Sequence, residues 1–246
     1  MKAFERRIGQ AIILGVSLSA VSPALAQMNP IILAGPQNNA MGQIMALRSK
    51  QMQQQFDQRS ASRAGAEVPM PETRVSPSLV ISSDPAVTRR VHDLYIDGLT
   101  QSSGAAQASQ VDERLGNIRI TFARMVGSYG LRADNLDDVM AAHIIVMWMA
   151  ANQRSRLPTP VQVQAVRRQM RNVFASGAGV ISDATERQSA AEYVMYETCM
   201  TVLVRNELRL RPDLDKRISD AVDMKMAEQG YALRDLKLTD QGLIKG

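Results

Sequence analysis

The 246-residue sequence is poor in cysteine, histidine and aromatic residues. Cys199 is the only cysteine, which excludes an intrachain disulfide, and its apolar surroundings predict a buried side chain. The two histidines, His92 and His143, are far apart, so the chain lacks the histidine pair of a metalloprotease motif. Aromatic residues make up 4% of the chain, against 15 methionines, so we expect methionine to fill much of the core.

The sequence also lacks the short motifs of common enzyme classes. It contains neither a Gly-rich phosphate loop nor a Gly-x-Ser-x-Gly nucleophile turn. A catalytic triad assembled in space from distant residues is not excluded, because its members need no common motif. We therefore predict no catalytic residue, cofactor or resident metal, and we favour a non-enzymatic protein.

The net charge is too small to predict a nucleic-acid-binding protein. The chain carries +5, of which the first 26 residues contribute +2 and the remainder +3. Nucleic-acid-binding domains are usually more basic than this, with the positive charge gathered on one face.

The first 26 residues have the form of a secretory signal peptide. A basic start is followed by a mostly apolar stretch over residues 8–21, which is shorter than the roughly 20 residues that cross a bilayer. Ala24 and Ala26 then supply the small residues that a signal peptidase accepts, so cleavage is expected before Gln27. This predicts a periplasmic or secreted bacterial protein that is not an integral membrane protein after cleavage; an uncleaved membrane anchor is the alternative.

Residues 27–83 are predicted to be a disordered arm. Five of the eight residues at 51–58 are glutamine, and prolines follow at 69, 71 and 77. Such a segment has few large apolar side chains, so it buries too little surface to offset the loss of chain entropy on folding.

Residues 84–246 are predicted to form a single all-α domain. Apolar residues recur at helical spacing, and capping residues or proline mark helix starts near residues 85, 110, 136, 160, 184 and 212. The third helix, residues 136–151, has no charged residue after Asp138 apart from a possible proton on His143, so it is expected to be buried nearly all round. Only residues 236–238 alternate like a strand, in a tail expected to pack back on the helices. The expected fold is an antiparallel bundle of five or six helices around the third and fifth.

The start of the third helix carries the first candidate site. Asp137 and Asp138 are best explained by helix capping and by compensation of the helix dipole. His143 follows on the same helix and is expected to be a hydrogen-bonded core residue. The alternative is a pocket for a small ligand or a substrate, lined by Asp138 and His143.

Copper binding is a further alternative. Thioether and imidazole groups suit Cu(I), and His143 lies one helical turn from Met147. Met224 and Met226 form a Met-x-Met sequence, but on a helix their side chains point about 200° apart, which is poor geometry for binding one ion.

A stretch without acidic residues carries the second candidate site. No aspartate or glutamate occurs between Asp138 and Asp183, whereas the fourth predicted helix holds Arg167, Arg168 and Arg171. These arginines are expected to be exposed and to contact an acidic protein or an anionic component of the cell envelope. The alternative is a solvated face whose arginines pair with glutamates of the fifth helix.

Part of the domain resembles a family of exported bacterial proteins without an established activity. The resemblance lies in a Gly-containing turn, an Asn-led helix start and an Ala-rich helix with a tryptophan; the residues are Gly130-Leu131, Asn135-Leu136-Asp137-Asp138, Ala141-Ala142 and Trp148. It extends over residues 84–240 and implies an exported, helical, single-domain protein. Together these observations favour a binding or scaffolding protein.

Overall fold

The computed structural model describes residues 79–175, 181–208 and 211–246. Most of these residues are helical, as predicted, and the only sheet among them has two strands. The predicted signal peptide and nearly all of the predicted arm lie outside the described residues. Within the described ranges, none of the helices is both long enough and apolar enough to cross a membrane.

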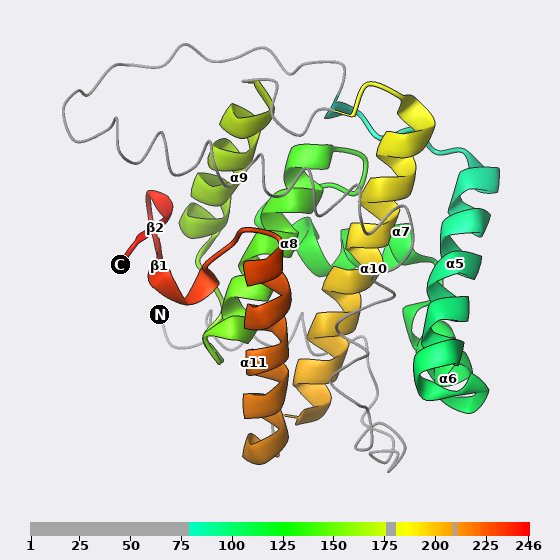
Figure 1. The fold of residues 1–246 in the computed structure, drawn as a ribbon. Helices are drawn as coiled ribbons and strands as arrows, with labels where there is room; N and C mark the ends of the chain where they lie inside the picture. Colours follow the sequence, from blue (N-terminus) through cyan, green and yellow to red (C-terminus); the bar gives the residue numbers. More distant parts are fainter. Residues whose placement is uncertain (1–78, 176–180, 209–210) are drawn as a thin grey trace, which may run out of the picture.

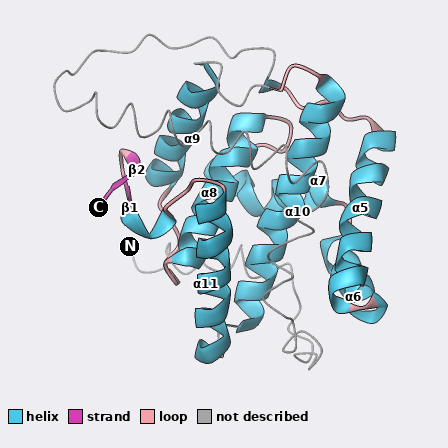
Figure 2. Ribbon diagram, in the orientation of Figure 1, coloured by secondary structure: helices cyan, strands magenta, loops and turns pink. Residues whose placement is uncertain are grey.

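The described elements follow one another in the order shown in Figures 1 and 2. They are α5 (Pro85–Ser103), α6 (Ala105–Leu115), α7 (Ile118–Val126), η3 (Gly127–Tyr129), α8 (Leu136–Ala151), α9 (Pro160–Ala175), α10 (Ala184–Leu208), α11 (Pro212–Glu228), η4 (Leu233–Asp235), β1 (Leu236–Thr239) and β2 (Gly242–Lys245).

Helix α8 lies at the centre of the core. Every residue of α8 except Val146 is buried, and the helix packs against α9, α10 and α11 (Figure 1). The side chain of Asn135 caps the helix by accepting a hydrogen bond from the Asp137 N–H at 3.3 Å. The prediction of a helix buried nearly all round is confirmed, and its uncharged composition is the reason.

Helix α10 is the longest of the described elements and packs against helices on two of its sides. It packs against α8 and also against α5 and α7. Cys199 of α10 is buried, as predicted, and this burial raises the pKa of its thiol to about 12. The thiol therefore stays protonated and unreactive near neutral pH.

The second predicted helix is two helices, which raises the number of α-helices in the described residues to seven. Gly116 has φ +51° and ψ −136°, a conformation that ends α6, and Asn117 caps the start of α7. The sequence predicts a single helix between the starts near residues 110 and 136, so the break at Gly116 was not predicted. Apolar residues on both sides of the break are buried, with Leu115 on α6 and Ile118 and Phe122 on α7.

The folded domain begins before Asp84. Leu79 and Ile81, which the sequence assigned to the arm, are buried. Val80 pairs with Asn135, and the Ile81 N–H donates to the Asp134 carbonyl at 2.9 Å. The boundary was misplaced because five residues are too few to show a periodicity, and because their partners lie more than 50 positions away.

The C-terminal tail packs on the helices, as predicted, and it forms a two-stranded hairpin, which the sequence did not predict. Strands β1 and β2 pair antiparallel, with Leu238 opposite Leu243. The Gln169 side chain of α9 accepts a hydrogen bond from the Leu243 N–H at 2.9 Å and donates to its carbonyl at 3.0 Å. The Trp148 indole N–H of α8 donates to the Leu236 carbonyl at 2.9 Å. Two polar side chains thus attach the hairpin to the core.

We predict that Gly116→Ala destabilises the protein whereas Gly127→Ala does not. An alanine at position 116 must adopt a positive φ, at a cost of about 1–3 kcal/mol. Gly127 has ordinary helical angles (φ −59°, ψ −34°) and open space at its Cβ, so alanine there is neutral or slightly stabilising. Urea denaturation of both variants measures the difference. Equal stabilities would contradict the helix break at Gly116.

Candidate functional site

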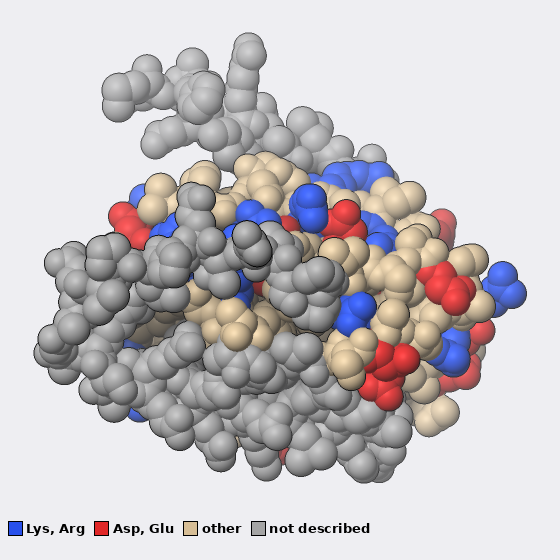
Figure 3. Space-filling view, turned by 90° about the horizontal axis from the view of Figure 1, so that it is seen from above, with Lys and Arg blue, Asp and Glu red and all other residues tan. Residues whose placement is uncertain are grey.

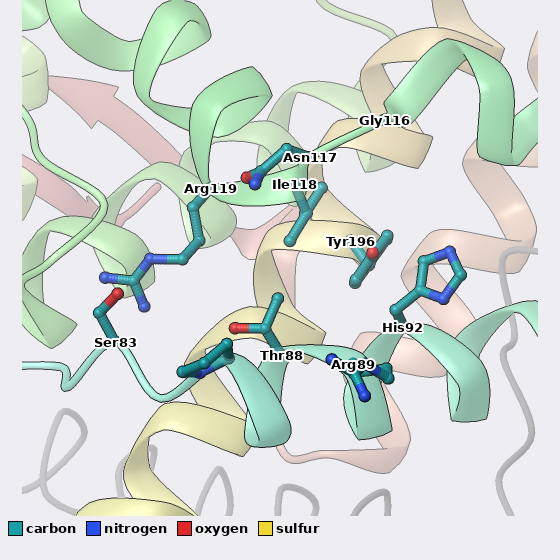
Figure 4. A pocket seen from close by; sticks show the side chains of 10 residues that line it. Ser83, Thr88, Arg89, His92, Gly116, Asn117, Ile118, Arg119 and Tyr196 are labelled. Atoms are coloured by element: carbon teal, nitrogen blue, oxygen red, sulfur yellow. The ribbon is translucent and has the colours of Figure 1, made fainter.

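A cavity of about 360 Å³ opens between the start of α5, the junction of α6 with α7, and the middle of α10. Figure 4 shows Arg119 beside Ser83 at one end of the cavity and His92 at the other, with Tyr196 between them. The lining residues are Ser83, Pro85, Thr88, Arg89, His92, Gly116, Asn117, Ile118, Arg119 and Tyr196. This volume is at the lower end of the range of about 300–1,000 Å³ for small-molecule sites.

A buried carboxylate, Glu192 of α10, connects two walls of the cavity. Its Oε1 accepts hydrogen bonds from the Thr88 hydroxyl of α5 at 2.9 Å and from Arg119 Nη1 of α7 at 3.1 Å. Gln188 of α10 donates a third at 3.0 Å. Glu192 is fully buried, and its Oε2 has no partner among the described residues. Because a buried carboxylate is costly without its donors, Thr88 and Arg119 are held in place.

The same network holds the segment that precedes α5. Arg119 Nη1 also donates to the Ser82 carbonyl at 2.9 Å, and the Ser82 hydroxyl donates to Gln188 Oε1 at 3.1 Å. Gln188 Nε2 in turn donates to the Asp84 carbonyl at 2.8 Å. The rim of the cavity at Ser83 is therefore fixed by its neighbours.

His92 lies between two carboxylates. Its Nδ1 is 2.9 Å from Asp93 Oδ1, and its Nε2 is 2.9 Å from Asp112 Oδ1 on α6. Partial burial lowers the pKa of His92, but the hydrogen bonds to Asp93 and Asp112 outweigh it, so the pKa is raised. Because a carboxylate oxygen only accepts hydrogen bonds, the ring can donate to both aspartates only when both of its nitrogens are protonated, and it then links α5 to α6.

Tyr196 is one of the lining residues. Its ring stacks on Tyr95 with centroids 4.6 Å apart, and only 2% of the residue is exposed. Burial raises the pKa of Tyr196 above its usual value, and the nearby carboxylates Asp112 and Glu192 raise it further. The hydroxyl therefore keeps its proton, and it forms no hydrogen bond with another described residue.

Other lining residues also hold unused donors. Arg89 is exposed and forms no ion pair or hydrogen bond within the described part of the chain. Arg119 uses Nη1 twice, whereas its Nε and Nη2 have no described partner. The Asn117 Oδ1 accepts from the Ile120 N–H at 3.2 Å, which leaves the Asn117 amide N–H groups unused among the described residues. The cavity is rich in donors.

The predicted arginine contact face is not a free surface. Arg171 Nε lies 2.9 Å from Asp137 Oδ2, and Arg167 Nη2 donates to Asp138 Oδ2 at 3.1 Å. Both aspartate side chains are fully buried. Of the three candidates only Arg168 is exposed. The prediction of three exposed arginines was wrong for Arg167 and Arg171, because they neutralise buried carboxylates rather than glutamates of α10.

On the described part of the face that Figure 3 shows, basic and acidic side chains are interspersed. Asp138 also accepts from the Arg132 N–H at 3.0 Å, and its second oxygen lies 2.5 Å from Arg167 Nε, whereas one oxygen of Asp137 lacks a hydrogen-bond partner among the described residues. Burial raises the pKa of Asp138 to about 6, with a further contribution from Asp137, although Arg167 lowers it.

His143 is a core residue outside the cavity. It is 5% exposed, and its Nδ1 lies 3.0 Å from the Thr198 hydroxyl, which itself donates to the Val194 carbonyl. The Thr198 oxygen therefore accepts from His143, which places the proton on Nδ1. Burial lowers the pKa of His143 to about 4. Neither Asp138 nor His143 lines the cavity described above.

The two methionines of the Met-x-Met sequence differ in exposure and do not face the same surroundings. Met226 is buried, whereas Met224, two positions earlier on α11, is 63% exposed. Met147 is buried and its sulfur lies 3.8 Å from the Thr201 hydroxyl, which donates to it. Within the described ranges, no three side chains among histidine, cysteine, aspartate and glutamate are grouped so that they could hold a metal ion.

The sequence did not predict this cavity, although it contains two features that are related to it. Gly116-Asn117 is a helix stop followed by a helix cap, which marks a corner of the chain. Glu192 is an isolated charge among apolar and small residues, and such a charge, when buried, needs partners. Neither signal alone shows that the two positions meet in space.

Comparison with protein-family models, with curated proteins and with solved structures found no match. The resemblance to a family of exported proteins therefore stays a prediction.

We predict that His143→Gln reduces the loss of stability on acidification. The unfolded chain binds a proton at His143 near pH 6.5, whereas the native chain binds it only near pH 4. Stability is therefore lost as the pH falls through this window, by about 2–3 kcal/mol between pH 7 and 4.5. Asp138 acts in the opposite sense between pH 4 and 6, so the variant must be compared with the unmodified protein in urea denaturation at both pH values. An identical loss in the two proteins would contradict the buried neutral histidine.

Proposed function

We propose that this chain is an exported, non-enzymatic binding protein whose site is the cavity between α5, α7 and α10. The observation that supports the proposal is the set of lining side chains with unused hydrogen-bond donors: Arg89, Asn117, Arg119 and Tyr196. Protein donors next to a cavity are expected to find a partner in water or in a ligand. The hydrogen-bond network around Glu192 holds Thr88 and Arg119 in place before a ligand binds.

The chemistry at the cavity favours binding over catalysis. A general base needs a free nitrogen or oxygen within reach of a substrate proton. Both ring nitrogens of His92 face carboxylates, and the lining residues Ser83 and Thr88 have no histidine hydrogen-bonded to their hydroxyl groups. The lining residues thus contain donors that hold a ligand rather than an activated nucleophile.

The proposal includes the compartment and the arrangement of the chain. Residues 1–26 support export, residues 27–78 would act as a tether, and the helices around α8 and α10 would behave as one antiparallel bundle. A contact through the three arginines of α9 has less support than the cavity, because Arg167 and Arg171 are engaged with buried aspartates.

We predict that a small polar compound raises the melting temperature of the full chain and that Ser83→Trp abolishes this effect. Ser83 is an exposed lining residue, so a tryptophan there fills the cavity at little cost to folding. Ser128→Trp is the matched control, because Ser128 is exposed in η3, at the far end of α7. Thermal shift with panels of acids, amines, sugars and neutral amides is the measurement.

Two results would contradict the proposal. One is a screen in which no compound of any class changes the melting temperature. The other is a ligand that binds Ser83→Trp and the unmodified protein with equal affinity.

The export part of the proposal has its own prediction. Expression in a bacterial host should yield a mature protein that begins at Gln27, because Ala24 and Ala26 form the cleavage site. Mass spectrometry of the purified protein measures the N-terminus, and Ala26→Arg should block processing. A mature protein that retains Met1 in the unmodified chain would contradict export through a cleaved signal peptide.

A further inference from the structure

We propose that the cavity binds a small anionic ligand whose carboxylate or phosphate groups contact Arg119 and Asn117 toward one end and Arg89, beside His92, toward the other (Figure 4). This inference rests on the proposed function and adds the chemical class of the ligand to it.

The charges that line the cavity favour an anion. Three lining residues are basic, namely Arg89, His92 and Arg119, and none of the described residues that line it is acidic. A cationic ligand would therefore meet only like charges on the walls. A neutral ligand would leave the Arg89 guanidinium without a charged partner among the described residues.

The available donors match an oxyanion. Arg119 has Nε and Nη2 free of described partners, and two adjacent guanidinium nitrogens form the fork that binds both oxygens of a carboxylate or phosphate. Arg89 adds a second guanidinium, and Asn117 adds an amide that uses only its oxygen within the protein.

The start of α7 adds a further contribution. Helix α7 has nine residues, and Asn117, Ile118 and Arg119 of its first turn line the cavity. The first N–H groups of a helix have no partner within the helix, and the positive end of the helix dipole favours an anion there. Tyr196 of α10, which is 98% buried and keeps its phenol proton, adds a neutral donor to the lining.

Carboxylates near the cavity do not reverse this preference. Asp93 and Asp112 each face the imidazolium of His92 at 2.9 Å, and Glu192 faces Arg119 at 3.1 Å. Asp93 and Asp112 thus share the one positive charge of the protonated His92 ring, Glu192 is paired with Arg119, and Arg89 keeps a positive charge without a described partner. A ligand oxyanion in direct contact with the arginines would gain charge-assisted hydrogen bonds, which are stronger at short range than the residual repulsion.

The test compares ligands of one length and different charge. Isothermal titration of the full chain uses succinate, its neutral diamide and 1,4-diaminobutane, with inorganic phosphate and acetate as further probes of the oxyanion. We expect succinate or phosphate to bind at least about tenfold more tightly than the diamide, and the diamine not to bind.

Three variants locate the contact. Arg89→Gln should weaken oxyanion binding about tenfold or more, because it removes a charged donor from an exposed wall. Asn117→Asp keeps the helix cap, since aspartate caps as well as asparagine, but it places a negative charge at the site and should weaken binding at least as much. Arg90→Gln is the control, because Arg90 is exposed on the same helix but does not line the cavity.

The outcomes separate the two proposals. Binding of succinate or phosphate that Arg89→Gln and Asn117→Asp weaken, and Arg90→Gln does not, supports the oxyanion site and shows which oxyanion it prefers. If the diamide or the diamine binds as tightly as succinate and Ser83→Trp abolishes that binding, the ligand class is wrong while the binding function stands. If no ligand of any charge binds, the binding function itself fails.

Discussion

The buried carboxylate of Glu192 is the interaction on which the cavity depends. It is fully enclosed and receives hydrogen bonds from Thr88 of α5, Gln188 of α10 and Arg119 of α7. An unpaired carboxylate in such surroundings would be strongly destabilising, so the three donors are held together by the cost of separating them. Because Thr88 and Arg119 also line the cavity, the interaction that stabilises the contact between the helices also fixes the shape of the site.

Buried carboxylates are also paired with arginines of a neighbouring helix at the contact between α8 and α9. Asp137 and Asp138 at the start of α8 are neutralised by Arg171 and Arg167, one helical turn apart on α9. These pairs join two helices and engage two half-buried arginines with buried carboxylates. The free cationic groups of the site are instead Arg89 and part of Arg119, near the beginnings of α5 and α7.

The sequence predicted the parts of the fold that depend on local signals. The starts of α5, α8, α9, α10 and α11, the burial of α8 and the packing of the C-terminal tail followed from caps, proline and apolar spacing. The break at Gly116 was missed because a single glycine inside an apolar seam is compatible with one helix or with two. The cavity was missed because its parts are distant: Thr88 and Glu192 are 104 positions apart, and Arg119 and Glu192 are 73 apart. Such pairings depend on the packing of whole helices, which composition does not encode.

Hydrogen exchange measured by mass spectrometry on Glu192→Gln tests the central role of this carboxylate most directly. The variant keeps the size of the side chain and removes its charge. We expect faster exchange in the backbone amides of residues 82–88 and 117–121, which the network holds, and unchanged exchange in α8, which contributes none of the described hydrogen bonds to Glu192. Unchanged exchange in both 82–88 and 117–121 would show that the cavity walls are held by something other than Glu192, and would contradict the account.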